Sequence, residues 1–115
     1  MEEFQLRTDD GRTVCARCAR AESPFHRMRG LLGRRSLEPG EGILLRPAGS
    51  IHTAFMRFAI DAVFVDADGR VLRVVDSLPA WRAAGAKGAK AVVELPAGAA
   101  ATAGLAPGAR LQLPG

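Results

Sequence analysis

The stretch from residue 61 to residue 75 reads Asp-Ala-Val-Phe-Val-Asp-Ala-Asp-Gly-Arg-Val-Leu-Arg-Val-Val and decides the class of fold. Two runs rich in β-branched residues flank the short segment Ala67-Asp68-Gly69, which has the composition of a tight turn. The pattern predicts a β-hairpin. Gly69 is expected in the left-handed backbone conformation that follows a type I turn, where glycine carries no steric penalty.

Outward from this hairpin, the chain repeats short segments of the same kind. Ser23-Pro24 is expected to start one helix ending near Gly33, because Ser is a good N-cap and Pro fits the first helical position. A helical turn is expected over Ala97–Thr102, and a loop over residues 79–90. Alternating or apolar runs predict further strands over residues 3–8, 12–19, 43–46, 91–95 and 109–113. Residues 51–58 are compatible with either a strand or a loop.

These strands follow one another too closely for repeated βαβ units. The sequence therefore predicts a mainly β (α+β) fold: a small, mostly antiparallel, partly closed sheet or barrel with one or two short helices. The 115 residues suit a single domain over residues 1–115, which can bury a core without covalent staples. No apolar run approaches the ~20 residues of a membrane span. The segment Met1-Glu2-Glu3-Phe4 lacks the features of a secretion signal, so the expected location is cytoplasmic.

The net charge of +4 is unevenly distributed along the chain. Residues 12–35 contain seven Arg and one Glu, a pattern that can face nucleic acid. Fourteen of the sixteen basic residues are Arg and Ala is abundant, however, which is also typical of a compositional bias. No aromatic residues interleave the Arg cluster to stack on bases. Nucleic-acid binding through residues 12–35 is therefore kept only as an alternative.

Cys15 and Cys18 form a Cys-x-x-Cys motif. In a cytosolic protein this motif indicates metal binding or redox chemistry before a structural disulfide. Residues three apart on a strand point to opposite faces, however, so the two sulfurs are not expected to meet. We predict two ordinary thiols, no metal and no cofactor.

Several longer motifs carry a resemblance to a known family. They are Arg29-Gly30-Leu31-Leu32-Gly33-Arg34, Ile51-His52-Thr53, residues 55–66, Asp68-Gly69-Arg70-Val71, Pro79 with Trp81, and Glu94-Leu95-Pro96-Ala97-Gly98. Together they resemble domain of unknown function family 192, a bacterial and archaeal family, over about residues 5–113. The resemblance implies a compact β-rich fold and no particular reaction. One departure is Gly108-Ala109, where the family often has Gly-Asp.

The candidate site lies in the largely apolar segment 51–61, which contains His52, Arg57 and Asp61. A buried charge is costly unless it is paired. Arg57 and Asp61 can simply pair with each other while His52 bonds the backbone. Alternatively, they form a pocket with an anion-binding Arg, a titratable His and an oriented carboxylate. The predicted ligand-binding residues are His52, Met56, Arg57 and Asp61, with Arg29 and Arg34 as a carboxylate- or phosphate-binding rim or, alternatively, as a solvated helix face.

The leading functional hypothesis is a non-catalytic binding domain, monomeric or homodimeric, for a small polar or anionic ligand or a peptide segment of a protein. The alternative is an enzyme in which His52 and Asp61 act as an acid–base pair, which requires the two side chains to lie within hydrogen-bond reach.

Overall fold

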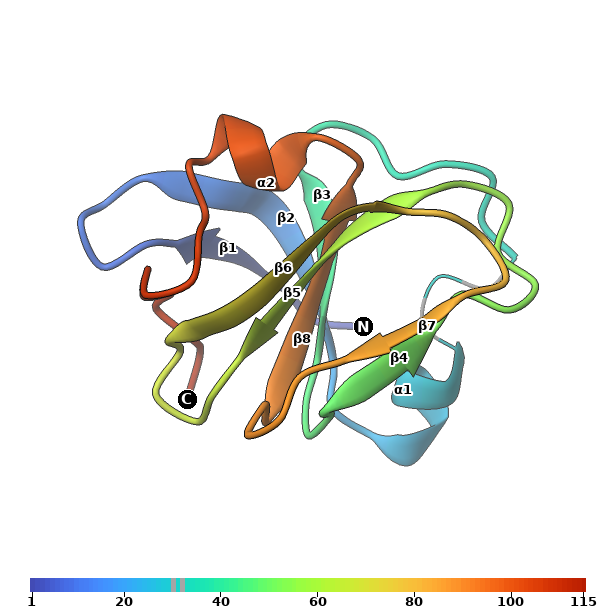
Figure 1. Cartoon of the computed structure of the whole chain (residues 1–115), viewed down its shortest axis with the longest axis horizontal. Coiled ribbons are helices and arrows are strands. Elements are labelled where there is room, and N and C mark those ends of the chain that lie inside the picture. The colour runs from blue at the N-terminus through green and yellow to red at the C-terminus, as the bar shows by residue number, and fades with distance from the viewer. Residues whose placement is uncertain (30, 32) are drawn as a thin grey trace.

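A curled six-stranded sheet forms the centre of this computed structural model (Figure 1). The structure describes residues 1–29, 31 and 33–115. For Phe25, Met28 and Arg29 it describes the backbone and not the side chain. The sheet strands are β1 (Glu3–Arg7), β2 (Thr13–Ala21), β3 (Glu41–Leu45), β5 (Ile60–Val65), β6 (Val71–Leu78) and β8 (Ala91–Pro96). A second small sheet contains β4 (Ser50–His52) and β7 (Ala83–Gly85), and the helices are α1 (Pro24–Arg29) and α2 (Ala99–Thr102).

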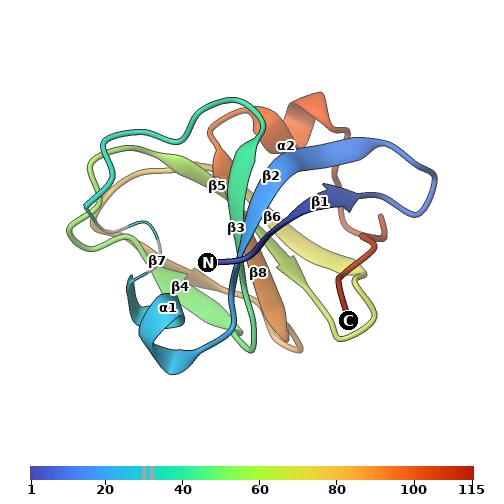
Figure 2. The same cartoon turned by 180° about the vertical axis from the view of Figure 1, so that it is seen from behind.

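The strand order in the large sheet is β1-β2-β3-β8-β5-β6. The β2–β3 pair is parallel, and the other neighbours are antiparallel. The predicted hairpin is the β5–β6 pair, and Gly69 has a φ of 86° in its turn. The mainly β fold is thus confirmed, and the sheet does not close into a barrel. Viewed from behind, β1 and β2 lie across β8 and β6 (Figure 2), so the sheet wraps around part of its own core.

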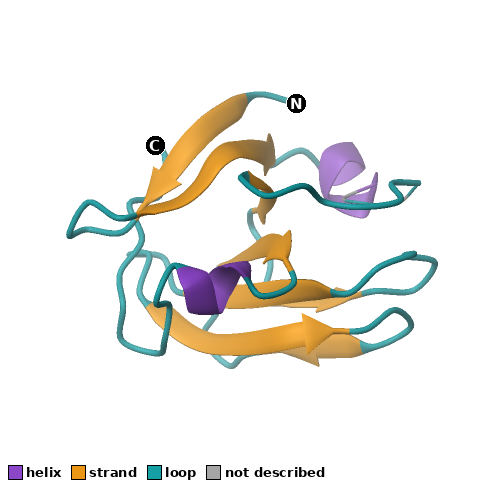
Figure 3. Cartoon of the chain, turned by 90° about the horizontal axis from the view of Figure 1, so that it is seen from above, coloured by secondary structure: helices purple, strands orange, loops and turns teal. Residues whose placement is uncertain are grey.

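Each face of the sheet is covered by a different set of elements. On the inner face, Leu44, Val63 and Val93 pack against β1, β2, α2 and the C-terminal segment. Figure 3 shows this arrangement from above, with α2 between the two curled halves of the sheet at the near end. On the outer face, Ile43 and Phe64 belong to clusters covered by the β4–β7 pair. We call the β4–β7 pair the β4–β7 layer.

Two predicted elements differ in the structure. Residues 109–113 form no strand, because the chain there makes only single bridges, from Leu111 to Thr8 and from Arg110 to Arg70. Residues 79–90, expected as a loop, contain β7, which is short enough to escape pattern recognition.

The predicted helix begins as expected but ends early. The Ser23 hydroxyl accepts the His26 N–H at 3.1 Å, which is the expected N-cap, and α1 ends at Arg29. The predicted apolar face of Phe25, Met28 and Leu32 lies outside the described side chains, whereas Leu31 is buried.

The two cysteines meet in the core, contrary to the sequence expectation. Leu6 pairs with Cys15 and Phe4 pairs with Cys18, so two residues of β2 lie opposite the single residue Gln5. This β-bulge reverses the alternation of side chains, and both sulfurs enter the inner-face cluster. The Cys15 thiol also donates to the Gly40 carbonyl at 3.4 Å. Both cysteines are free and buried in the structure.

Candidate functional site

Asp61 is completely buried and its carboxylate is bonded to the backbone. One carboxylate oxygen accepts the Ser77 N–H at 2.8 Å, and the other accepts the N–H groups of Gly98 and Ala100 at 3.0 and 2.9 Å. These bonds attach the first turn of α2 and the end of β6 to the sheet. Asp61 is therefore a structural anchor, and its negative charge is distributed over three N–H dipoles.

His52 and Arg57 do not join Asp61. Both are exposed, and no ion pair or hydrogen bond in the described residues connects either side chain to the carboxylate. Neither the Arg57–Asp61 pair nor the His52–Asp61 acid–base pair is formed. Met56 is 7% exposed and packs in an outer-face cluster with Ile60. Of the predicted site residues in segment 51–61, Met56 and Asp61 are thus buried structural residues, whereas His52 and Arg57 are exposed.

Arg29 and Arg34 are the two arginines predicted to form a rim near α1. Arg34 donates to the Glu41 carboxylate at 2.8 Å, and Glu41 also accepts the Glu38 N–H, so Arg34 is already neutralised. Both the Glu38 N–H bond and Arg34 hold the pKa of Glu41 below its usual range. The side chain of Arg29 lies outside the described residues.

Two aromatic side chains are exposed close in sequence to Arg57 and Arg82. Phe55 and Trp81 are 71% and 60% exposed, and their ring centroids lie 4.6 Å apart at an interplanar angle of 59°. Both residues have a left-handed backbone, with φ angles of 64° and 63°. This conformation costs about 1–2 kcal/mol for a residue with a side chain. Two strained residues therefore present large apolar rings to solvent, and burial does not offset the cost.

Buried Thr53 holds this strained geometry. Its carbonyl accepts the N–H groups of Met56 and Trp81 at 3.1 and 3.0 Å. Its hydroxyl donates to the Pro79 carbonyl at 2.7 Å and accepts the Arg82 N–H at 2.8 Å, and its own N–H donates to the Arg82 carbonyl at 2.7 Å. One fully buried threonine thus joins the loop after β4 to the loop before β7 and places the two rings side by side.

The two segments that carry the aromatic pair contain charges of one sign only. Residues 47–60 and 77–93 contain no Asp or Glu. Their cations are Arg57, Arg82, Lys87 and Lys90, all exposed, and His52 on β4 pairs with Ala83, which follows Arg82 in the chain. None of the ion pairs of the described residues includes these side chains. We call Phe55, Trp81, His52, Arg57 and Arg82 the aromatic–basic surface.

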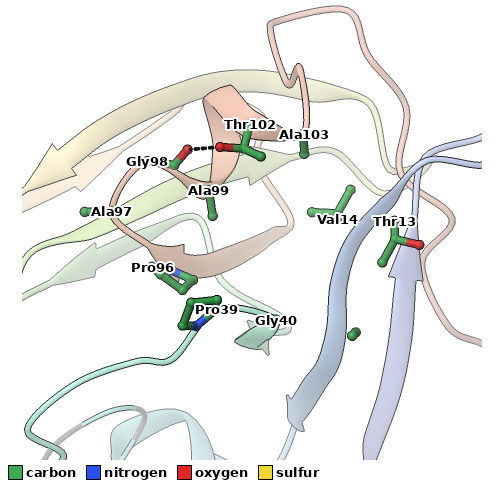
Figure 4. A pocket seen from close by; sticks show the side chains of 11 residues that line it. Thr13, Val14, Pro39, Gly40, Pro96, Ala97, Gly98, Ala99, Thr102 and Ala103 are labelled. Carbon is green, nitrogen blue, oxygen red and sulfur yellow. Dashed lines mark hydrogen bonds between the residues drawn. The ribbon is translucent and has the colours of Figure 1, made fainter.

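A groove of about 470 Å³ opens at the other end of the fold, between β2 and α2 (Figure 4). Its walls are small, uncharged residues, including Val14, Pro39, Pro96 and Ala99, with Thr13 and Thr102 as the polar groups. Asp61 fixes the α2 wall through Gly98 and Ala100. None of the described residues that line the groove is charged.

Sequence reasoning identified His52 and Arg57 in the aromatic–basic surface but missed Phe55, Trp81, Arg82 and Thr53. Phe55 and Trp81 lie 26 positions apart, and only the tertiary fold brings them together. A possible signal was the absence of acidic residues from both segments, since two separate acid-free stretches indicate one basic face when they become neighbours.

No helix in the described part of the chain is long and apolar enough to cross a membrane. Together, the fold and the surface define a small mainly β domain with an exposed aromatic–basic surface.

The family model of DUF192, described as "Uncharacterized ACR", matches residues 5–113, and the chain belongs to this family. A protein of unknown function from Novosphingobium aromaticivorans DSM 12444 has a similar crystal structure, with a TM-score of 0.84 and 22% identity over 96% of this chain and 85% of that chain. A protein from Sinorhizobium meliloti 1021, described as a "putative transcription regulator", aligns with a TM-score of 0.82 and 25% identity over 96% and 92% of the two chains. No curated protein matches the chain.

Proposed function

We propose that this protein is a non-catalytic binding domain that recognises an acidic, partly apolar peptide segment through the aromatic–basic surface. The single observation that carries the proposal is the exposure of Phe55 and Trp81 at strained backbone positions. Strain of this kind persists only where the surrounding structure enforces it, and it is concentrated at functional sites. Trp and Arg are also the residues that most often dominate the energy of protein–protein interfaces.

The chemistry of the partner follows from the surface itself. The rings are exposed rather than enclosed, so a macromolecular segment can cover them, whereas a small molecule generally needs a concave site. Arg57 and Arg82 can each bind a carboxylate, and no acid in residues 47–60 or 77–93 competes for them. An extended peptide that alternates carboxylates with apolar side chains would contact both features at once.

A single-stranded nucleic acid is less well matched to this geometry. Stacked bases need separate aromatic faces along the strand, whereas Phe55 and Trp81 are tilted by 59° against each other and each covers part of its neighbour. The Arg-rich segment 12–35 also has internal partners, because Arg12, Arg20 and Arg34 all form ion pairs with carboxylates. The description of the Sinorhizobium protein nevertheless makes nucleic acid the outcome to test against.

Trp81 provides the measurement, because it is the one Trp and the chain contains no Tyr. The probe is a peptide in which Asp and Glu alternate with Leu and Phe, with an Asn/Gln version of the same peptide as the uncharged control. We expect a saturable change in Trp81 emission with the acidic peptide only, and a weaker affinity at higher salt. Phe55→Ala, and the double change Arg57→Ser with Arg82→Ser, should each weaken binding at least about tenfold, or ~1.4 kcal/mol.

The matched control is Arg7→Ser, which removes an exposed side chain on β1 that bonds Gln5 and should leave the affinity unchanged. Equal binding of the uncharged peptide, or unaltered binding by Phe55→Ala, would refute the proposal. Tighter binding of oligothymidylate than of the acidic peptide would replace the peptide by nucleic acid as the partner.

A further inference from the structure

Glu94 is a buried acid at the centre of the large sheet. It lies on β8 between Ile43 of β3 and Ala62 of β5, and it is 4% exposed. Its neighbours Val93 and Leu95 both point into the inner-face cluster. Because side chains alternate along a strand, Glu94 shares the outer face with Val92. This is the face that the β4–β7 layer covers through Ile51 and Ala84, which pack against both outer-face clusters.

No described side chain or N–H group donates a hydrogen bond to the Glu94 carboxyl group, and no ion pair among the described residues includes it. The charged groups on the surrounding elements are His52, Arg57, Arg73, Asp76, Glu41, Arg46, Arg82, and His26 with Arg27 on α1. Of these, Glu41 pairs with Arg34, Arg46 pairs with Glu22, and Arg73 donates to the Gly85 carbonyl. His52, Arg57, Asp76 and Arg82 are exposed.

Burial alone raises the pKa of Glu94, from 4.5 to about 7. An ionised carboxylate that is 4% exposed in an apolar layer is poorly hydrated, and it gains hydration when the covering residues move away. The cover here is the β4–β7 layer, which leads directly into Thr53 and Arg82 and therefore into the aromatic–basic surface.

We propose that Glu94 is a pH-dependent switch beneath the β4–β7 layer: the neutral carboxyl lets the layer pack onto the sheet, and the carboxylate loosens it. The proton passes to solvent and no other reactant is needed. The switch itself requires no partner, whereas its effect on peptide binding rests on the proposed function. The groups most affected are the Thr53 hydrogen bonds that hold Phe55 and Trp81 together.

Hydrogen exchange of the unmodified protein tests the switch without a ligand. After correction for intrinsic exchange, protection of the Thr53 and Arg82 amides should fall about thirtyfold between about pH 5.5 and about pH 8.5 if the carboxyl is freely hydrated in the opened layer. Amides in the centre of β5 should change less, because they remain in the sheet. Equal changes in both groups would show global unfolding in place of a local switch and would overturn the proposal.

Trp81 emission gives the second test and separates Glu94 from His52, which is the other titratable side chain close to this surface. We expect a transition near pH 7 that persists in His52→Asn and is absent from Glu94→Gln. Its loss in His52→Asn, or its persistence in Glu94→Gln, would contradict the proposal. Because neither measurement contains peptide, a positive result would stand even if the acidic peptide failed to bind.

Discussion

At the scale of single residues, the buried polar side chains explain how one sheet carries two separate regions of irregular structure. Asp61 fixes the α2 end of the molecule through three backbone N–H groups, and Thr53 fixes the loops that carry the aromatic pair. Both residues are fully buried and fully bonded. A buried polar group stabilises a fold when its partners are complete and destabilises it when one is missing.

Asp61→Asn should therefore lower the free energy of unfolding by about 2–4 kcal/mol, because an amide NH₂ would replace an acceptor that faces backbone donors. The control is Asp66→Asn. Asp66 also accepts two backbone N–H groups, from Asp68 and Arg70, but its turn is exposed and an Asn oxygen can replace one carboxylate oxygen there. Urea denaturation of both variants provides the comparison, and equal losses would show that Asp61 is not a special anchor.

Thr53→Val keeps the shape of the side chain and removes the hydroxyl, leaving the Pro79 carbonyl and the Arg82 N–H without this partner. We expect a loss of about 1–3 kcal/mol together with a change in the near-ultraviolet circular dichroism of Trp81. Thr102→Val is the matched control, because the Thr102 hydroxyl bonds the Gly98 carbonyl at an exposed position. A Thr53→Val protein with normal stability and an unchanged Trp81 signal would exclude Thr53 as the support of the aromatic pair.

At the scale of elements, the β5–β6 hairpin depends on its contact with the C-terminal segment. The Gly69 N–H donates to the Asp66 carbonyl within the turn, and the Gly69 carbonyl accepts the Leu111 N–H at 2.8 Å. A Cβ atom on Gly69 would collide with the Leu111 carbonyl. The C-terminal segment is thus held by single bridges and by this close backbone approach in place of a regular strand.

Gly69→Ala should therefore lower the free energy of unfolding by more than the usual penalty for an alanine with a left-handed backbone. Gly11→Ala is the control, because Gly11 has a similar φ of 90° and a Cβ there meets nothing within 4 Å. We expect about 1 kcal/mol for Gly11→Ala, from backbone strain alone, and at least about 2 kcal/mol for Gly69→Ala, measured by thermal denaturation. Equal losses of stability in the two variants would mean that the C-terminal segment moves away from residue 69 without an energetic penalty.

Regular elements were predictable from the sequence where the hydrophobic period was long enough to recognise. The β5–β6 hairpin, β8 and the Ser23 N-cap follow from local rules. The β4–β7 layer does not, because each strand has three residues and is defined by its partner across the fold. Cys15 and Cys18 were placed on opposite faces for a related reason: the bulge in β2 is set by its register with β1, which no local pattern reveals.

The candidate site was predictable only in part. His52 and Arg57 were visible as polar residues in an apolar segment, and the structure leaves both exposed. Asp61, from the same segment, is instead buried and anchors the start of α2 through two backbone N–H groups. Sequence spacing could not separate these roles, because the chain passes from the loop into β5 between them and the direction of each side chain depends on that transition.

At the scale of the whole molecule, the buried and paired acids give opposite dependences of stability on pH. Arg20 and Arg46 beside Glu22 hold its pKa below the usual range, so its contribution is present above about pH 4.5 and is lost as the pH falls. The raised pKa of Glu94, about 7, has the opposite effect. The contribution of Glu94 to the free energy of unfolding is complete below pH 4.5 and is lost as the pH rises through 7. For these two groups, stability should therefore be greatest near about pH 4.5 and should fall as the pH rises toward 7.

Glu94→Gln should remove the alkaline part of this profile. The variant should match the parent near about pH 4 and exceed its unfolding free energy by up to about 3 kcal/mol near about pH 8, since one unit of pKa shift corresponds to about 1.4 kcal/mol. Glu3→Gln changes an exposed acid on β1 and should keep the parent profile. The check is urea denaturation across the pH range, and an unaltered alkaline limb in Glu94→Gln would mean that Glu94 is hydrated in the folded protein.

Because the bulge in β2 buries both cysteines, their reactivity reports how often this domain opens. Cys15 and Cys18 are 1% and 0% exposed and lie in the inner-face cluster between the two curled halves of the sheet. A thiol reagent can reach them only when those halves separate, so its rate of reaction counts opening events. The same burial shields both sulfurs from oxidants for as long as the fold is closed, so the lifetime of the reduced thiols is set by how often the molecule opens.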